Sequence, residues 1–376
     1  MSAARARGLA AALFASVLAL AGCASSNRPD PTPLKSFTPQ IAGKEVWRAS
    51  IGTLKFPLRI EAGADRFTLS QSDGTVIALA RDGGKELWRA EAGGSPSAGV
   101  GSDGRFTALV TTSNELVVLD GTKAAWRTRL NSRVVTPPLV AGERVFVLSV
   151  DRAVQAFDAA DGRPLWTFRR PGGDPLTLLQ PGVLMAWGDT LVAGQGPRMV
   201  GIDPLLGSLR WDTAVASPRG TNEVERLADL VAPAVKVGDM VCARAFQSAV
   251  GCVAAERGVL NWTKNVGGTE GIAADADYVF GADASDRITA WRRASGEVAW
   301  NNDQLLYRGL SAPLAVGRTV IFGDSEGYVH FLDRTNGTVL LRLPTDGKAI
   351  VSAPVASGTT ILVVTSGGGV YAFRPE

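Results

Sequence analysis

The sequence predicts an all-β fold, an eight-bladed β-propeller with four antiparallel strands in each blade. Three observations lead to this prediction. A short pattern that closes on tryptophan returns at nearly even spacing, each unit consists of short β-rich segments, and the last unit is divided between the two ends of the chain. Units of this length that contain four strands are typical of propeller blades.

The repeat is clearest in VQAFDAADGRPLW (154–166), where alternating apolar residues lead into an Asp/Gly turn and then a tryptophan. Successive units, separated by 38 to 51 residues, close at Trp47, Trp88, Trp126, Trp166, Trp211, Trp262, Trp300 and, with leucine in place of tryptophan, Leu341. A period near 42 occurs in both solenoids and propellers, so the content of each unit must decide between them.

Each unit reads as four short strands. It opens with an apolar stretch that reaches a glycine turn, as in PPLVAGERVFVLS (137–149). It continues with a second turn, a β-rich strand such as YVHFLD (328–333), a third turn and the strand that carries the tryptophan. Alternation with period two and frequent glycine turns predict antiparallel strands, and no comparable stretch has a 3.6-residue apolar period. Helical repeats are therefore excluded.

Counting the units gives eight blades. Seven are complete, and the eighth is split: residues 354–376 supply three strands without a closing tryptophan, while residues 43–50 supply a closing strand alone. Joined, they close the ring without an open sheet edge. The Asp and Gly residues of the repeat form the turn before the last strand, and we expect each tryptophan to pack between neighbouring blades.

The first 22 residues read as a signal peptide rather than part of the fold. Arg5 and Arg7 precede an apolar stretch of 14 residues (8–21), which is short for a membrane-spanning helix. The stretch ends in LAGC (20–23), which resembles the lipobox of bacterial lipoproteins and implies acylation of Cys23. The alternative is a plain secretory signal with Cys23 incidental.

The residue after the cysteine and the segment that follows suggest where the chain works. Ala24 replaces the aspartate that commonly retains lipoproteins in the inner membrane, which implies the outer membrane with the body in the periplasm. Residues 23–43 contain four prolines and little to bury, so we expect a disordered or polyproline-like tether. The propeller is predicted over residues 44–376.

Composition excludes one class of partner. The net charge is +3, and without Arg5 and Arg7 the chain has 37 basic and 36 acidic residues. A nearly neutral body without a clustered basic patch is a poor ligand for nucleic acid, because many phosphate contacts are needed.

The repeat itself points to a family. Its pattern A-x-D-x-x-[TS]-G-x-x-x-W resembles the pyrroloquinoline-quinone (PQQ) type of propeller repeat. Within that group the chain resembles the BamB family, lipoproteins of the outer-membrane β-barrel assembly machinery. The segments that carry the resemblance are EVERLADL (223–230), LLYRGLSAPL (305–314), GDSEGYVHFLD (323–333) and GVYAFRPE (369–376). The resemblance implies a non-catalytic scaffold without cofactor that binds the periplasmic POTRA domains of BamA and assists barrel insertion. Nascent barrel strands are a further partner, through β-augmentation.

The runner-up is a periplasmic PQQ-dependent or metal-binding enzyme. The quinone enzymes of this fold would need a calcium site, a catalytic aspartate and usually adjacent cysteines, and the chain has no Cys-Cys pair. Its one histidine, His330, alternates on a strand between Val329 and Phe331, so a structural role is favoured. Aspartates that recur at one position of the repeat are turn formers. We therefore expect no catalytic, cofactor-binding or metal-binding residue.

Two further cysteines, Cys242 and Cys252, flank a segment that reads as a turn over residues 246–249. Antiparallel strands on either side would bring the cysteines opposite each other, and we expect a disulfide between them in an oxidising periplasm. The alternative is two small buried thiols.

The two longest intervals, Trp166 to Trp211 and Trp211 to Trp262, contain the candidate binding loops, since blade packing does not require the additional residues. RRPGGDPLTLLQPG (169–182) carries leucines that either fold back onto the blades or form a docking ridge.

The BamB resemblance implies that a P-x-L-x-L-R loop docks on BamA. Pro175, Leu176 and Leu178 match this motif, whereas Leu179 stands in place of the arginine.

The second loop, SPRGTNEVERLADLVAP (217–233), is similar to an acidic segment of the same family. Glu223, Glu225 and Asp229 match that segment, whereas Val231 replaces its last aspartate. The resemblance implies that Asp229 contacts the partner. The alternative is a solvated loop in which Arg226 pairs locally with Glu225 or Asp229.

Overall fold

The computed structural model describes residues 29–172, 176–218 and 220–375. Within these ranges all regular structure is β, and no helix is long and apolar enough to cross a membrane. Contacts divide the chain into Met1–Pro31 and Thr32–Glu376, and the second unit contains every strand.

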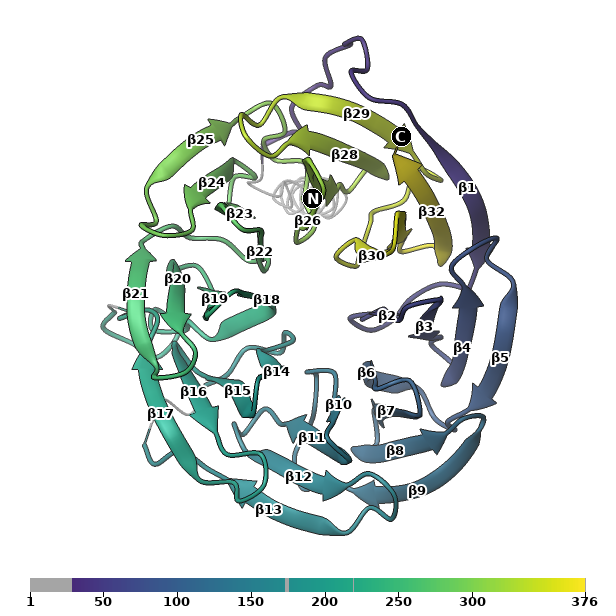
Figure 1. Ribbon diagram of the computed structural model, residues 1–376, viewed down its shortest axis with the longest axis vertical. Coiled ribbons are helices and arrows are strands. Elements are labelled where there is room, and N and C mark those ends of the chain that lie inside the picture. Colours follow the sequence, from purple (N-terminus) through teal and green to yellow (C-terminus); the bar gives the residue numbers. More distant parts are fainter. Residues whose placement is uncertain (1–28, 173–175, 219, 376) are drawn as a thin grey trace, which may run out of the picture. The chain divides into compact units, whose positions relative to one another are not determined.

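Eight four-stranded antiparallel sheets form a ring around a central axis, as Figure 1 shows, so the predicted eight-bladed propeller is confirmed. The strands of blades 1 to 4, from the innermost strand of each blade outward, are β2 (Glu61–Ala62), β3 (Arg66–Ser70), β4 (Thr75–Ala80) and β5 (Glu86–Glu91); β6 (Pro96–Ser102), β7 (Phe106–Thr111), β8 (Glu115–Asp120) and β9 (Lys123–Arg129); β10 (Leu139–Ala141), β11 (Arg144–Leu148), β12 (Val154–Asp158) and β13 (Pro164–Phe168); and β14 (Leu184–Trp187), β15 (Thr190–Gln195), β16 (Arg198–Ile202) and β17 (Leu209–Ala214).

The strands of blades 5 to 8, in the same order, are β18 (Leu230–Val237), β19 (Met240–Ala245), β20 (Ala249–Ala254) and β21 (Val259–Lys264); β22 (Ala273–Ala274), β23 (Tyr278–Ala282), β24 (Ile288–Arg292) and β25 (Val298–Asn302); β26 (Leu314–Val316), β27 (Thr319–Gly323), β28 (Tyr328–Asp333) and β29 (Val339–Pro344); and β30 (Val355–Ser357), β31 (Thr360–Val364), β32 (Gly369–Pro375) and β1 (Gly43–Ser50). The last blade therefore combines both ends of the chain.

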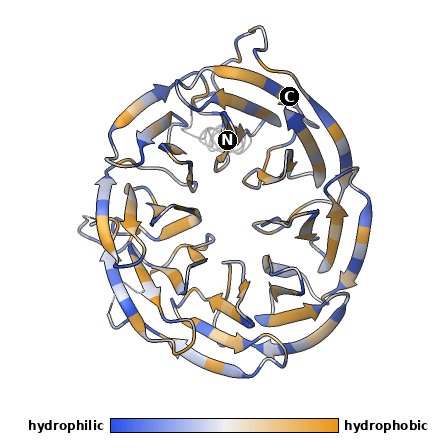
Figure 2. Cartoon of the chain, viewed as in Figure 1, coloured by the Kyte–Doolittle hydropathy of each residue, from blue (hydrophilic) through white to orange (hydrophobic). Residues whose placement is uncertain are grey.

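Ring closure follows the predicted pairing. β1 lies antiparallel to β32, with Trp47 opposite Ala372 and Ser50 opposite Gly369. The apolar core lies between blades, on the two middle strands of each sheet. Most residues of the outer strands are half-buried or exposed, and Figure 2 shows hydrophobic and hydrophilic residues mixed along them. In blade 7, for example, all five residues of β27 are buried, because both faces of this strand pack against neighbouring blades.

Five of the repeated tryptophans donate a hydrogen bond to the next blade. Trp126 on β9 of blade 2 donates its Nε1–H to the carbonyl of Ala159 in the last turn of blade 3, at 2.8 Å. A Cβ added at Gly162 of that turn would lie 2.5 Å from the Trp126 ring. The same hydrogen bond into the turn of the following blade is made by Trp47, Trp166, Trp262 and Trp300. The pattern of aspartate, glycine and tryptophan thus encodes contact between blades, since the ring of one blade covers the turn of the next.

Leu341, the exception in the repeat, has a structural reason. It precedes blade 8, whose outer two strands come from opposite ends of the chain and are not joined by a turn. A tryptophan at 341 would therefore meet no turn glycine of the repeat, and Gly43 at the start of β1 lies against Leu341 instead.

The N-terminal segment, residues 32–42, differs from the tether expected over residues 23–43. Thr32 and Leu306 share a backbone hydrogen bond, as do Gln40 and Leu340. Phe37 packs against the core between blades 6 and 7, and the guanidinium of Arg342 lies over its ring. The few apolar side chains of this segment, Leu34 and Phe37, pack against a buried apolar cluster that the blades supply. The compact unit therefore begins at Thr32 rather than at residue 44.

Candidate partner-binding site

The two long loops lie side by side at the same edge of blades 3 to 5. The first connects β13 to β14, and the second connects β17 to β18. Gly182 of the first loop forms an isolated antiparallel bridge with Val231 of β18, and the N–H of Ala232 donates to Pro181 O at 2.9 Å. Backbone pairing of this kind fixes the end of the first loop against blade 5.

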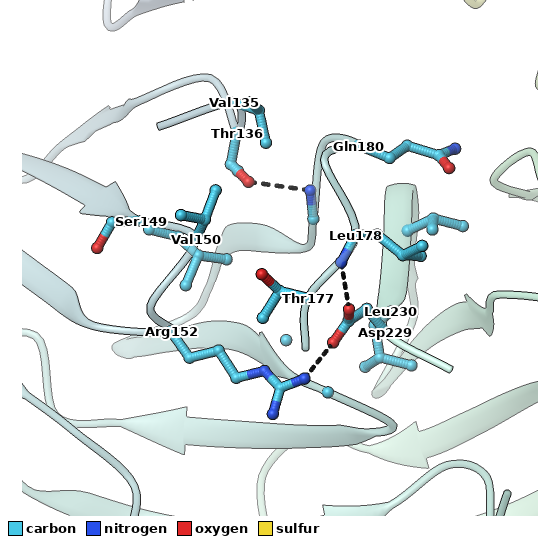
Figure 3. Close-up of a pocket in the computed structure, with 15 residues that line it drawn as sticks. Val135, Thr136, Ser149, Val150, Arg152, Thr177, Leu178, Gln180, Asp229 and Leu230 are labelled. Carbon is cyan, nitrogen blue, oxygen red and sulfur yellow. Dashed lines mark hydrogen bonds and ion pairs between the residues drawn. The ribbon is translucent and has the colours of Figure 1, made fainter. Parts of the chain in front are cut away.

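Asp229 holds the leucine loop, residues 176–182. Its Oδ2 accepts the backbone N–H of Leu178 at 2.8 Å, and its Oδ1 accepts Nη2 of Arg152 at 2.9 Å (Figure 3). The same Nη2 donates to the carbonyl of Leu176 at 2.9 Å. The Asp229 side chain is only 15% exposed, and its hydrogen bonds stabilise the loop from its inner side. Direct contact of Asp229 with a partner stays a prediction.

Arg152 is a site residue that the sequence did not reveal. It lies in the turn between β11 and β12 of blade 3 with φ of 62°, a conformation that few non-glycine residues adopt. Its residue type and its place in an ordinary hairpin turn carry no sign of a contact 77 positions away. Thr136 adds a second support, because its Oγ1 accepts the N–H of Gly182 at 2.9 Å (Figure 3).

The sequence left two alternatives for the leucines of this loop, packing back onto the blades or forming an exposed ridge, and the structure shows some leucines in each place. Leu178 is half-buried and lines a cavity of about 40 Å³ together with Leu148 and Leu230. Leu176 and Leu179 are 38% and 61% exposed. The loop thus keeps one leucine inward and presents two outward. Pro175, predicted as part of the same motif, lies outside the described residues.

The acidic loop is largely organised by contacts within itself. Glu225 accepts the backbone N–H of Thr221 at 2.7 Å and the side-chain amide of Asn222 at 2.8 Å. Arg226 donates to the carbonyl of Gly220. Val231, in place of an acidic residue, is buried in β18. Glu223 remains exposed to solvent.

Cys242 and Cys252 occupy directly opposed positions on β19 and β20 and form a disulfide, with Cα atoms 4.0 Å apart. The turn between them covers residues 246–248. Both residues are fully buried between blades 5 and 6, so the bridge is part of the core and not of a reactive site.

His330 is enclosed within blade 7. Its Nε2 lies 2.9 Å from Oδ2 of Asp324, and its Nδ1 accepts from Nε of Arg342 at 3.3 Å. Burial lowers the pKa of His330, which favours the neutral ring. With both ring nitrogens engaged and no exposed surface, the histidine is poorly placed to exchange protons with a substrate.

The described residues can be compared with the groups that a quinone or metal centre would need. Among the described residues no three His, Cys, Asp or Glu side chains are grouped so that they could hold a metal ion. Cys242 and Cys252 are joined across two strands and are not adjacent in sequence, unlike the pair expected beneath a quinone. Cys23, the predicted lipidation site, lies outside the residues that the structure describes.

Comparison with known proteins identifies the family of the chain. A family model described as "Outer membrane protein assembly factor BamB" matches residues 72–302. The protein of that name from Burkholderia pseudomallei is 37% identical over 372 residues, which cover 97% of each chain. The chain belongs to the BamB family. The BamB of Bordetella pertussis is 33% identical over 375 residues, 97% of this chain and 96% of that protein.

Solved structures agree on the fold. BamB from Moraxella catarrhalis matches with a TM-score of 0.80 at 23% identity, over 89% of this chain and 100% of that one. The quinohemoprotein alcohol dehydrogenase of Comamonas testosteroni matches with a TM-score of 0.67 at 14% identity, over 88% and 76% of the two chains. At these identities the likeness concerns architecture alone, and chemistry must be judged from the side chains.

Proposed function

We propose that this BamB-family chain is a non-catalytic scaffold of the outer-membrane β-barrel assembly machinery, whose leucine loop docks on the periplasmic POTRA domains of BamA. The observation that carries the proposal is the exposure of Leu176 and Leu179 on a loop held by Asp229, Arg152 and Thr136. A loop that is already ordered loses little conformational entropy on binding, and exposed leucines gain from being covered.

The proposal includes the anchor. Acyl chains on Cys23 would hold the propeller at the outer membrane, facing the periplasm, because several buried acyl chains give durable anchoring. Replacement of Cys23 by serine should move the protein from the membrane to the soluble fraction after cell fractionation. Recovery of the C23S protein in the outer membrane would contradict the anchor.

Nascent barrel strands are a second proposed partner. The outer strand of each blade pairs on one side only, which leaves a backbone edge for β-augmentation. A photo-crosslinker placed on β9 should capture a barrel protein during its assembly. Capture at equal yield from a buried position on β8 would show that the product does not report edge pairing.

Negative charges introduced into the leucine loop test the docking proposal. Leu176→Glu together with Leu179→Glu should abolish co-purification of BamA from solubilised outer membranes, because carboxylates cannot be buried unpaired in an apolar contact. The matched control is Leu205→Glu with Leu206→Glu, which changes two exposed leucines on the last turn of blade 4. The control should retain BamA.

Equal recovery of BamA with both double variants would remove the leucine loop from the mechanism. Thermal unfolding of each purified variant distinguishes loss of docking from loss of fold. The single variant Leu176→Glu serves the same purpose, since it changes one exposed side chain and leaves the inward-facing Leu178 in place.

A further inference from the structure

A second cavity of about 500 Å³ lies beside the leucine loop, between blades 3 and 4. Leu176 and Thr177 line it, so it is continuous with the surface proposed for docking. The remaining wall comes from the two long loops and from the hairpin turns of blades 3 and 4, and it includes five arginines: Arg152, Arg169, Arg170, Arg198 and Arg226. A cavity of this volume has room for one or more side chains of a partner.

The charges around this arginine cavity are unequal. Arg170 and Arg198 share a single carboxylate, Asp212, whose Oδ2 accepts from Arg170 Nε at 2.7 Å and whose Oδ1 accepts from Arg198 Nε at 2.5 Å. Burial by itself would raise the pKa of Asp212, but the hydrogen bonds from Arg170 and Arg198 outweigh it and lower the pKa. The single negative charge of Asp212 therefore pairs with the two positive charges of Arg170 and Arg198.

Arg170 also has unused donors. Its hydrogen bond to Asp212 employs Nε, and among the described residues neither Nη group has a protein partner. The side chain is only 26% exposed, so these donors are held at the cavity rather than spread into solvent. Neighbouring Arg169 pairs with Asp151 through Nη1 and keeps more than half of its surface exposed. A planar guanidinium in such a position presents parallel N–H groups that match a carboxylate.

We propose that the arginine cavity receives an acidic side chain of the protein that docks on the leucine loop. The partner segment would place an apolar residue on Leu176 and, beside it, an aspartate or glutamate between Arg169 and Arg170. The inference rests on the proposed docking function and defines the chemistry of the partner: an acidic residue next to an apolar one. Arginine recognition of a buried carboxylate supplies specificity and speeds association, while the leucines supply buried apolar area.

The test uses variants that leave the fold intact. In Arg169→Ala with Arg170→Ala, Asp212 keeps Arg198 and Asp151 keeps the hydroxyl of Ser149. The matched control is Arg127→Ala with Arg129→Ala, which removes the same charge at the end of the outer strand of blade 2. Affinity for the purified periplasmic domains of BamA is measured by calorimetry at several salt concentrations.

The arginine variant should raise the Kd about tenfold and flatten its salt dependence, because a charge-assisted contact is lost. The control should change the Kd by less than about twofold, since charges outside the contact area contribute little. Arg170→Lys should bind between wild type and the alanine variant, because lysine keeps the charge but not the paired donors.

The outcomes separate this inference from the docking proposal. If wild type does not bind the BamA domains, the docking function itself fails. If the leucine variants lose binding while the arginine variant binds as wild type does, only the arginine cavity is refuted. Sedimentation with phosphatidylglycerol vesicles tests the other anionic ligand. Arginine-dependent vesicle binding, with BamA affinity unchanged, would overturn the proposal in favour of a lipid headgroup.

Discussion

Replacing Gly162 by alanine tests the contact between blades. Gly162 has φ of 75°, and its missing side chain leaves room for the ring of Trp126 from the preceding blade. An alanine would meet two separate costs. The left-handed conformation costs about 1–2 kcal/mol for a residue with a Cβ. A Cβ 2.5 Å from the ring must also push Trp126 or the turn aside, at a cost of about 1–3 kcal/mol for an overpacked site.

Gly142 provides the comparison in the same blade. It also has a positive φ, 57°, but an added Cβ would meet no atom within 4 Å. Gly142→Ala should therefore cost about 1–2 kcal/mol, the conformational part alone. The difference between the two variants isolates the overlap with the tryptophan, expected at about 1–3 kcal/mol.

Urea unfolding followed by tryptophan fluorescence measures this difference, and far-UV circular dichroism checks that both probes report one transition. Combining Gly162→Ala with Trp126→Ala removes the obstructing ring, so alanine at 162 should then cost no more than alanine at 142. If Gly162→Ala is no more destabilising than Gly142→Ala, the tryptophan does not pack on the turn as described.

Two further predictions concern blade 7. Asp324 is buried with Arg308 and His330. Burial by itself would raise the pKa of Asp324, but its hydrogen bonds, above all the one with His330, lower the pKa below its ordinary value of 3.8. Its stabilising effect is therefore complete above that value and is lost as pH falls through the lower pKa of the folded protein. Asp324→Asn should cost about 3 kcal/mol at neutral pH and weaken the dependence of urea unfolding on acid pH; an unchanged acid profile would contradict this. The second concerns the N-terminal segment, where Arg342 lies over the Phe37 ring and donates to the Lys35 carbonyl. Wild type should therefore resist trypsin at the bond after Lys35, and Phe37→Ala should expose this bond. Equal cleavage rates of the two proteins would show that the segment is not held through Phe37.

The fold was largely readable from the sequence because the repeat is a local signal that occurs many times. Each copy places glycine and tryptophan at a set spacing within one hairpin, so alignment of the copies gives strand count and blade count. The contact itself is not local. Trp126 meets Gly162 of the next blade, 36 positions away, and the reason for Leu341 became visible only when blade 8 was seen to lack the turn.

The candidate site was predictable in part. Excess loop length and exposed leucines indicated where to look, because neither is needed for blade packing. The contacts of Asp229 within the protein were not predictable, since a carboxylate in an acidic loop gives no sign that it turns inward to Leu178 N and Arg152. The prolines of residues 23–43 likewise suggested a free tether, while the apolar cluster on which Phe37 packs exists only after blades 6 and 7 have come together.

The sequence by itself determined the all-β class, the eight blades, the split closing blade and the positions of the two long loops. Each of these depends on neighbours in the chain or on counting copies. Tertiary structure alone decided which arginines meet at one cavity, which carboxylate they share and which end of the tether lies against the ring. Those contacts join residues from different blades, and their energies depend on burial and distance, which exist only once the ring has closed.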